Sequence, residues 1–118
     1  MEPISHFADA VVAGKTLYVS GLVATDEEGN VVGTDDVVEQ TRQIFRNLRH
    51  VLDMAGARPS DVAKVTIYMR DVDQRPLINP IRQEFFGPHR PASTLIEVSA
   101  LVRPELLLEI EAVAQLPD

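Results

Sequence analysis

Residues 90–115 alternate twice between apolar and polar side chains, and this pattern constrains the fold more than any other part of the chain. Two alternating runs, 93–100 and 107–114, are separated by a break at Val102-Arg103-Pro104. A period of two is typical of strands with one apolar face, so the pattern predicts an antiparallel hairpin with its turn near Arg103. The expected apolar face carries Thr94, Ile96, Val98, Ala100, Leu108, Ile110, Ala112 and Ala114.

The opposite face of this hairpin would carry acidic residues. Its register would set Glu97 opposite Glu109, and Leu95 opposite Glu111. Facing like charges destabilise a strand pair. A sheet tolerates them on a solvated edge, or where cations or hydrogen-bond donors lie nearby, as in a ligand site. The pattern alone favours the solvated edge.

The composition indicates one globular domain, residues 1–118, with 45% hydrophobic and 25% charged residues. The absence of cysteine excludes disulfides, thiolate metal sites and cysteine nucleophiles. The first ten residues lack the basic region and apolar run of a signal peptide, and no apolar stretch reaches membrane-spanning length. We therefore expect a cytoplasmic protein without a membrane partner.

The charge balance disfavours nucleic-acid binding. Eleven basic and eighteen acidic residues give a net charge of −7, whereas nucleic-acid binding needs a concentrated basic footprint. The spacing of Arg42, Arg46 and Arg49 is typical of the solvated stripe of a helix. The three histidines are isolated from one another, so we expect no metal site.

The sequence pattern of residues 8–70 predicts a hairpin, then a helix and then a strand. The β-rich runs 8–13 and 16–21 flank Gly14-Lys15, which is a tight-turn signal. Apolar residues then recur at helical spacing for about five turns, from an Asp36 cap to a C-terminal Gly56. Residues 61–70 alternate as a strand.

A second helix is expected before Gly87-Pro88, but its start has two alternatives. Pro80 could occupy the first helical position after an Asn79 cap. Alternatively, the helix could begin at Pro76 with a strained first turn. In both cases it includes Ile81 and Phe85.

The element order β-β-α-β-α-β-β predicts an α+β fold, in which two helices cover one face of a mixed sheet. The other face would carry Leu95, Leu107 and Val113 among polar residues, which is too apolar to remain in water. Burial against copies of the same chain would cover it, so we expect a homo-oligomer.

The chain resembles the RidA/YjgF family of reactive-intermediate deaminases over nearly its whole length. The resemblance is carried by LYVSG, QTRQIFRNLRHVLDMAGA, DVAKVTIYMRDV, INPIRQEFFG, RPASTLIEV and EIEAVA. It implies a chorismate-mutase-like fold. It also implies a homotrimer with a central barrel and a small-molecule cleft at each subunit interface.

The resemblance further implies hydrolysis of reactive enamines and imines, such as 2-aminoacrylate, to 2-keto acids and ammonia without a metal or organic cofactor. In such enzymes the arginine of a Pro-Ala-Arg-Ser motif holds the substrate carboxylate. A tyrosine near the amino terminus and a glutamate of the last strand help to form the site and orient water.

This sequence departs from that pattern at two positions. Ser93 replaces the motif arginine after Pro91-Ala92, and Phe7 replaces the tyrosine. The glutamate is kept as Glu109. We therefore expect Glu109 and Ser93 to be catalytic, although the pattern of the residues alone would make Glu109 a solvated strand acid. The expected ligand-binding residues are Phe7, Ser20, Gly21, Asn79, Ser93 and Glu97.

Loss of the motif arginine predicts an altered substrate, neutral or cationic, and little activity on 2-aminoacrylate. Arg90 or Arg103, which flank the expected hairpin, could replace the missing cation. The alternative function is a non-catalytic trimer that binds a small molecule or regulates. A ribonuclease is disfavoured by the acidic charge and by the absence of a histidine pair.

Overall fold

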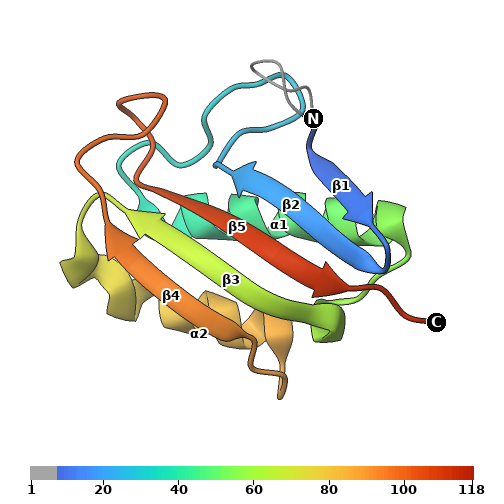
Figure 1. Ribbon diagram of the computed structural model, residues 1–118. Helices are drawn as coiled ribbons and strands as arrows, with labels where there is room; N and C mark the ends of the chain where they lie inside the picture. The colour runs from blue at the N-terminus through green and yellow to red at the C-terminus, as the bar shows by residue number, and fades with distance from the viewer. Residues whose placement is uncertain (1–7) are drawn as a thin grey trace.

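The computed structural model describes residues 8–118, which form a mixed sheet with two α-helices. The strands are β1 (Ala10–Ala13), β2 (Thr16–Leu22), β3 (Val62–Met69), β4 (Ala92–Glu97) and β5 (Leu108–Gln115). Their order across the sheet is β1-β2-β5-β3-β4 (Figure 1). Only the β3–β4 pair is parallel among these strands. The expected α+β class and mixed sheet are confirmed.

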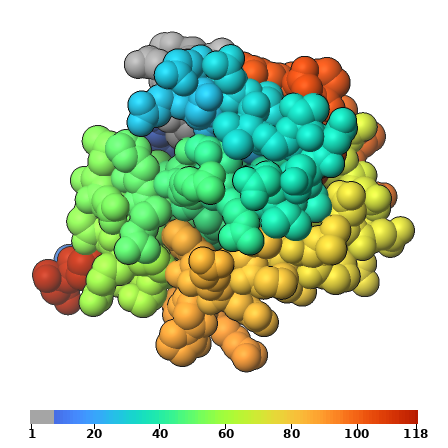
Figure 2. Space-filling model, turned by 180° about the vertical axis from the view of Figure 1, so that it is seen from behind, coloured from blue at the N-terminus to red at the C-terminus, as the bar shows by residue number. Residues whose placement is uncertain are grey.

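Helices α1 (Val37–Ala55) and α2 (Arg75–Phe86) both lie on one face of the sheet (Figure 1). Seen from that side, they form the outer layer of the molecule (Figure 2). The core lies between the helices and the sheet because each element turns its apolar stripe inward. Its fully buried side chains include Leu17, Ile44, Leu48, Leu52, Ile67, Ile78 and Ile110.

The ends of α1 follow the expected capping pattern. The Asp36 carboxylate accepts hydrogen bonds from the backbone N–H groups of Val38 and Glu39, each at 3.1 Å. These donors have no partner within the helix, so the cap stabilises its first turn. Gly56 ends the helix at φ 75°, a left-handed conformation that favours glycine.

The start of α2 is settled in favour of Pro76. The short 3₁₀ turn η2 (Val72–Gln74) leads directly into the helix, with Pro76 in its first turn and Pro80 inside it. The expected Asn79 cap is therefore wrong. Pro76 lies where a missing N–H costs nothing, and Pro80 removes one internal backbone donor just beyond the first turn.

The hairpin expected between residues 93–100 and 107–114 is wrong. β4 pairs in parallel with β3, whereas β5 lies between β2 and β3 and is antiparallel to both. A strand–helix–strand unit, here β3–α2–β4, joins parallel neighbours through its helix. β5 takes the central position because one of its faces buries Leu108, Ile110, Ala112 and Ala114.

This pairing also reverses the expected faces of β4. Leu95 lies beside Ile67, which is buried under the helices, whereas Ile96 lies beside Tyr68 on the face without helices. Ile96 is 44% exposed there. Leu107, just before β5, packs partly against the core. The face without helices is called the open face below. Of Leu95, Leu107 and Val113, which were expected on this face, only Val113 remains clearly there, beside Tyr18.

Within residues 8–118, no helix combines the length and apolar character needed to cross a membrane.

Candidate functional site

The helix-free face of the sheet carries a polar group on its central strands. Tyr68 on β3 donates a hydrogen bond to Oε1 of Glu111 on β5 at 2.5 Å. This hydrogen bond is the main reason that the pKa of Tyr68 is raised above its ordinary value. Glu111 is thus anchored by the phenol, while its neighbour on the same face, Glu109, lies directly opposite Tyr68 in the register.

Glu109 is half-buried, and its pKa is raised above the ordinary glutamate value. Partial burial is the larger cause, because it disfavours the charged form. The negative charge of Glu111 adds to the effect. A carboxyl group with a raised pKa can hold or release a proton closer to neutral pH, which suits general acid–base chemistry.

Gly21 makes room for the Glu109 carboxyl. A Cβ atom at position 21 would lie 2.8 Å from Cδ of Glu109 and closer still to Oε2. The β2–β5 register shifts between Val19 and Leu22, so Ser20 and Gly21 occupy an irregular part of β2. Such bulges re-aim side chains. Sequence-predicted residues Gly21 and Glu109 are therefore in contact, with Ser20 adjacent in the chain.

Ser20 ties the beginning of the described chain to this part of β2. Its hydroxyl donates to the backbone oxygen of Ala8 at 2.6 Å, and its backbone N–H donates to Asp9. The hydroxyl oxygen can still accept a hydrogen bond. Phe7, the next residue toward the amino terminus, lies outside the described residues.

A second polar group lies at the edge of the sheet, on the helix side. Ser93 on β4 is beside Val65, which is buried under the helices. A guanidinium nitrogen of Arg82, on α2, donates to Oγ of Ser93 at 2.9 Å. Asn79 lies three positions before Arg82, and therefore on the same side of α2. This group consists of sequence-predicted Ser93 and of Arg82, which was not predicted, while Asn79 is exposed on the same side of α2.

Arg82 lies in an unusual electrostatic environment. Burial lowers its pKa below the ordinary arginine value. Among residues 8–118 its guanidinium forms no ion pair, and its hydrogen-bond partner is the Ser93 hydroxyl. Arginine remains charged under all ordinary conditions, so the edge of the sheet carries a partly desolvated cation.

Glu97 has a backbone-capping role. Its Oε1 accepts a hydrogen bond from the backbone N–H of Val72 at 3.0 Å, at the start of η2. Glu97 therefore lies on the helix side of the sheet, and the expected pairing with Glu109 is wrong. The carboxylate holds the end of β4 against the segment that leads into α2.

A single chain does not bring Ser93 and Glu109 together. They project from opposite faces of the sheet, on strands that are separated by β3. Of the two cations considered from the sequence, Arg103 donates to the backbone oxygen of Gly29 at 2.9 Å, and Arg90 is exposed just before β4.

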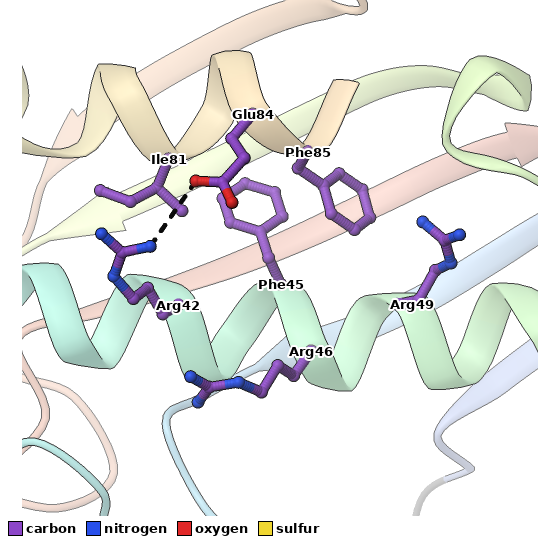
Figure 3. A pocket seen from close by; sticks show the side chains of 7 residues that line it. All are labelled: Arg42, Phe45, Arg46, Arg49, Ile81, Glu84 and Phe85. Carbon is purple, nitrogen blue, oxygen red and sulfur yellow. Dashed lines mark ion pairs between the residues drawn. The ribbon is translucent and has the colours of Figure 1, made fainter. Parts of the chain in front are cut away.

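A hollow of about 350 Å³ lies elsewhere, between α1 and α2 (Figure 3). Phe45 and Phe85 line it together with arginines of α1. Arg42 pairs with Glu84 across it at 3.6 Å, as the dashed line in Figure 3 marks. The hollow contains none of the sequence-predicted site residues, and its cations are partly matched by acids of the same helices.

The comparison with known proteins identifies the family. The family model described as Endoribonuclease L-PSP matches residues 1–116. A solved Yersinia pestis protein of the conserved Rid family is 31% identical, with a TM-score of 0.91, covering 97% of this chain and 90% of its own. The chain belongs to the RidA/YjgF family. A solved Mycobacterium tuberculosis member of the YjgF family is 33% identical, with a TM-score of 0.82, covering 93% and 86%.

Two relatives of this RidA/YjgF chain carry names that state a reaction. The 3-aminoacrylate deaminase RutC of Acinetobacter baylyi is 37% identical, covering 95% of this chain and 88% of its own length. A 2-iminobutanoate/2-iminopropanoate deaminase of Dermatophagoides farinae is 33% identical, covering 95% and 87%. The family relationship thus links this fold to deamination of enamines and imines.

Proposed function

We propose that this chain is a hydrolytic deaminase of small imines or enamines that needs no metal or organic cofactor. The observation that carries the proposal is Glu109, a half-buried carboxyl with a raised pKa, seated against Gly21 on the helix-free face. The names of the two deaminase relatives support the same chemistry. The net charge of −7 disfavours the ribonuclease activity that the description of the family model names.

The proposed reaction uses one carboxyl as base and then as acid. Glu109 accepts a proton from water as the water oxygen bonds to the imine carbon, and the electron pair of the C=N double bond moves to nitrogen. Glu109 then returns the proton to nitrogen. This gives a carbinolamine. Glu109 next takes the hydroxyl proton and passes it to the amino nitrogen as the C–N bond breaks, so that ammonia leaves and the carbon becomes a carbonyl. A carboxyl with a raised pKa is suited to both transfers.

The proposed assembly is a homotrimer whose sheets line a central barrel, with the site between copies. Glu109, with Tyr68 and Glu111, lies on one face of the sheet, and Ser93, with Arg82, lies on the opposite face. A site that includes both therefore needs the edge strand of one copy beside the open face of another. Tyr18 and Ile96, 50% and 44% exposed on the open face, support burial against another copy.

An Ile96→Asp variant tests this assembly. We expect it to dissociate the trimer, because it adds a charge to a surface that the assembly buries. Its effect on the single chain should be small, since Ile96 is 44% exposed there and surface substitutions typically change stability by less than about 0.5 kcal/mol. Sedimentation measures the mass, and circular dichroism confirms folding. A wild type that sediments as a 13.0 kDa monomer at micromolar concentration would contradict the assembly.

Turnover is tested by generating the imine in the assay. A pyridoxal-phosphate dehydratase acting on threonine or serine releases an unstable enamine or imine that carries a carboxylate. Formation of the keto acid is followed with and without this protein. Formation above the spontaneous rate on any of these substrates supports the proposal, whereas the loss of the motif arginine by itself predicts little activity on the 2-aminoacrylate released from serine. A neutral imine supplied in parallel tests the altered, neutral or cationic substrate that the replacement of the motif arginine by Ser93 predicts. Binding without turnover of either substrate would favour the alternative, a non-catalytic small-molecule-binding trimer.

A further inference from the structure

We infer that Arg82, on α2, holds the carboxylate of the substrate in place of the arginine that the strand motif lacks. This inference rests on the proposed function and names its substrate class. It makes the substrate a small imino or enamine acid that carries a carboxylate. The neutral or cationic ligand expected from Ser93 alone would then be wrong.

The geometry places the Arg82 guanidinium at the motif position itself. Its donor nitrogen lies 2.9 Å from Oγ of Ser93, so the side chain reaches across from α2 to the edge strand β4. Serine is small enough to leave this space open. An arginine at position 93 would bring a second guanidinium into the same region, where two like charges would repel each other.

Most N–H donors of the Arg82 guanidinium remain available for a ligand. Arginine carries five N–H groups in a planar fork, and the contact with the hydroxyl uses one of them. Among residues 8–118 no carboxylate pairs with it. A fork of this shape binds a carboxylate through two parallel hydrogen bonds, which gives orientation as well as affinity.

The other described arginines provide a contrast. Within the described part of the chain, Arg46, Arg70, Arg75 and Arg90 form no ion pair either, but they are exposed, whereas Arg82 is partly buried. Arg42, Arg49 and Arg58 pair with acids of this chain, and Arg103 donates to a backbone carbonyl. Burial lowers the pKa of Arg82, so its charge is partly removed from water without a compensating anion. An anionic ligand would restore that compensation. Asn79, three residues earlier on α2, adds an amide on the same side of the helix.

The experiment measures binding of two small probes to the intact assembly by titration calorimetry or ligand-observed NMR. One is 2-oxobutanoate, an anion, and the other is 2-oxobutanamide, its neutral counterpart. We expect wild type to prefer the anion. Arg82→Met should weaken 2-oxobutanoate binding by roughly 10- to 150-fold, the loss of one charge-assisted contact. Binding of the amide should be unchanged.

Two further variants make the result specific. Arg90→Met removes an exposed cation that lies close to the same strand in sequence, and it should leave binding of both probes as in wild type. Arg82→Lys keeps the charge but loses the fork. It should weaken 2-oxobutanoate binding by less than Arg82→Met does, and it decides the question if Arg82→Met does not assemble.

The outcomes separate this inference from the proposed function. An anion preference that survives both Arg82 variants, or that disappears in Arg90→Met, overturns the role of Arg82. The role of Arg82 is also overturned if Arg82→Met weakens binding of 2-oxobutanoate and of 2-oxobutanamide equally, or if wild type does not prefer the anion. Anion binding that depends on Arg82 without any imine turnover supports the inference and overturns the deaminase proposal. Imine turnover together with anion binding that does not depend on Arg82 supports the deaminase proposal and overturns the role of Arg82.

Discussion

A Glu109→Gln variant is expected to lower kcat/KM for imine hydrolysis by about 10²- to 10⁴-fold, the usual contribution of a positioned acid–base group. Glutamine has nearly the same shape, so it can lie against Gly21, but it cannot accept a proton from water. The fold should be unaffected because the side chain lies outside the helix-covered core. The dehydratase-coupled assay measures the loss, and circular dichroism checks the structure.

The pH dependence provides the second measurement of this prediction. The base form of Glu109 is lost as pH falls through its pKa. Because that pKa is raised, the wild-type rate should begin to fall at a higher pH than an ordinary glutamate would allow. Glu111→Gln removes the charge that is the smaller cause of the shift, so the fall should move to lower pH. Near wild-type turnover by Glu109→Gln would exclude Glu109 as the base.

A Gly21→Ala variant is expected to lower kcat/KM by about 10²-fold, because the reacting carboxyl would be displaced by about 1 Å. The new Cβ would lie 2.8 Å from Cδ of Glu109, so the side chain must move. The loss of stability should be small, since the displaced atoms are the end of a flexible side chain. Enzyme kinetics and thermal unfolding, measured on the same sample, test both parts.

A double variant shows whether Gly21 acts through Glu109. If it does, Gly21→Ala should cost almost nothing further in a Glu109→Gln background, because the group that it displaces is already inactive. Additive losses in the double variant would indicate a separate role for the irregular part of β2. Unfolding of the single variant, seen as a large fall in Tm, would mean that packing at Gly21 is the main effect.

Local patterns in the sequence determined most of the secondary structure. The turn at Gly14-Lys15, and α1 with Asp36 and Gly56 at its ends, depend on contacts within a few residues. The buried face of β5 follows from alternation alone. Glu109 and Gly21 were also identified from the sequence, although through family resemblance, because alternation by itself would make Glu109 a solvated acid.

The tertiary structure decided which strands are neighbours and which faces they share. Alternation gives a strand two faces, but it does not say which one is covered, and a change of pairing partner moved Leu95 to the helix side and Ile96 to the open side. The start of α2 depended on η2, which leads into the helix ahead of both prolines.

Arg82 shows most clearly what the sequence could not provide. It lies eleven positions before Ser93 and on a different element, so no local spacing links the two residues. Their contact exists because α2 packs beside the edge strand β4, which itself follows from the parallel pairing of β3 and β4. Contacts between elements depend on how those elements pack in three dimensions, whereas turns and caps depend on the chain nearby. The sequence therefore determined the elements and the acid on β5, and only the fold placed a cation beside Ser93.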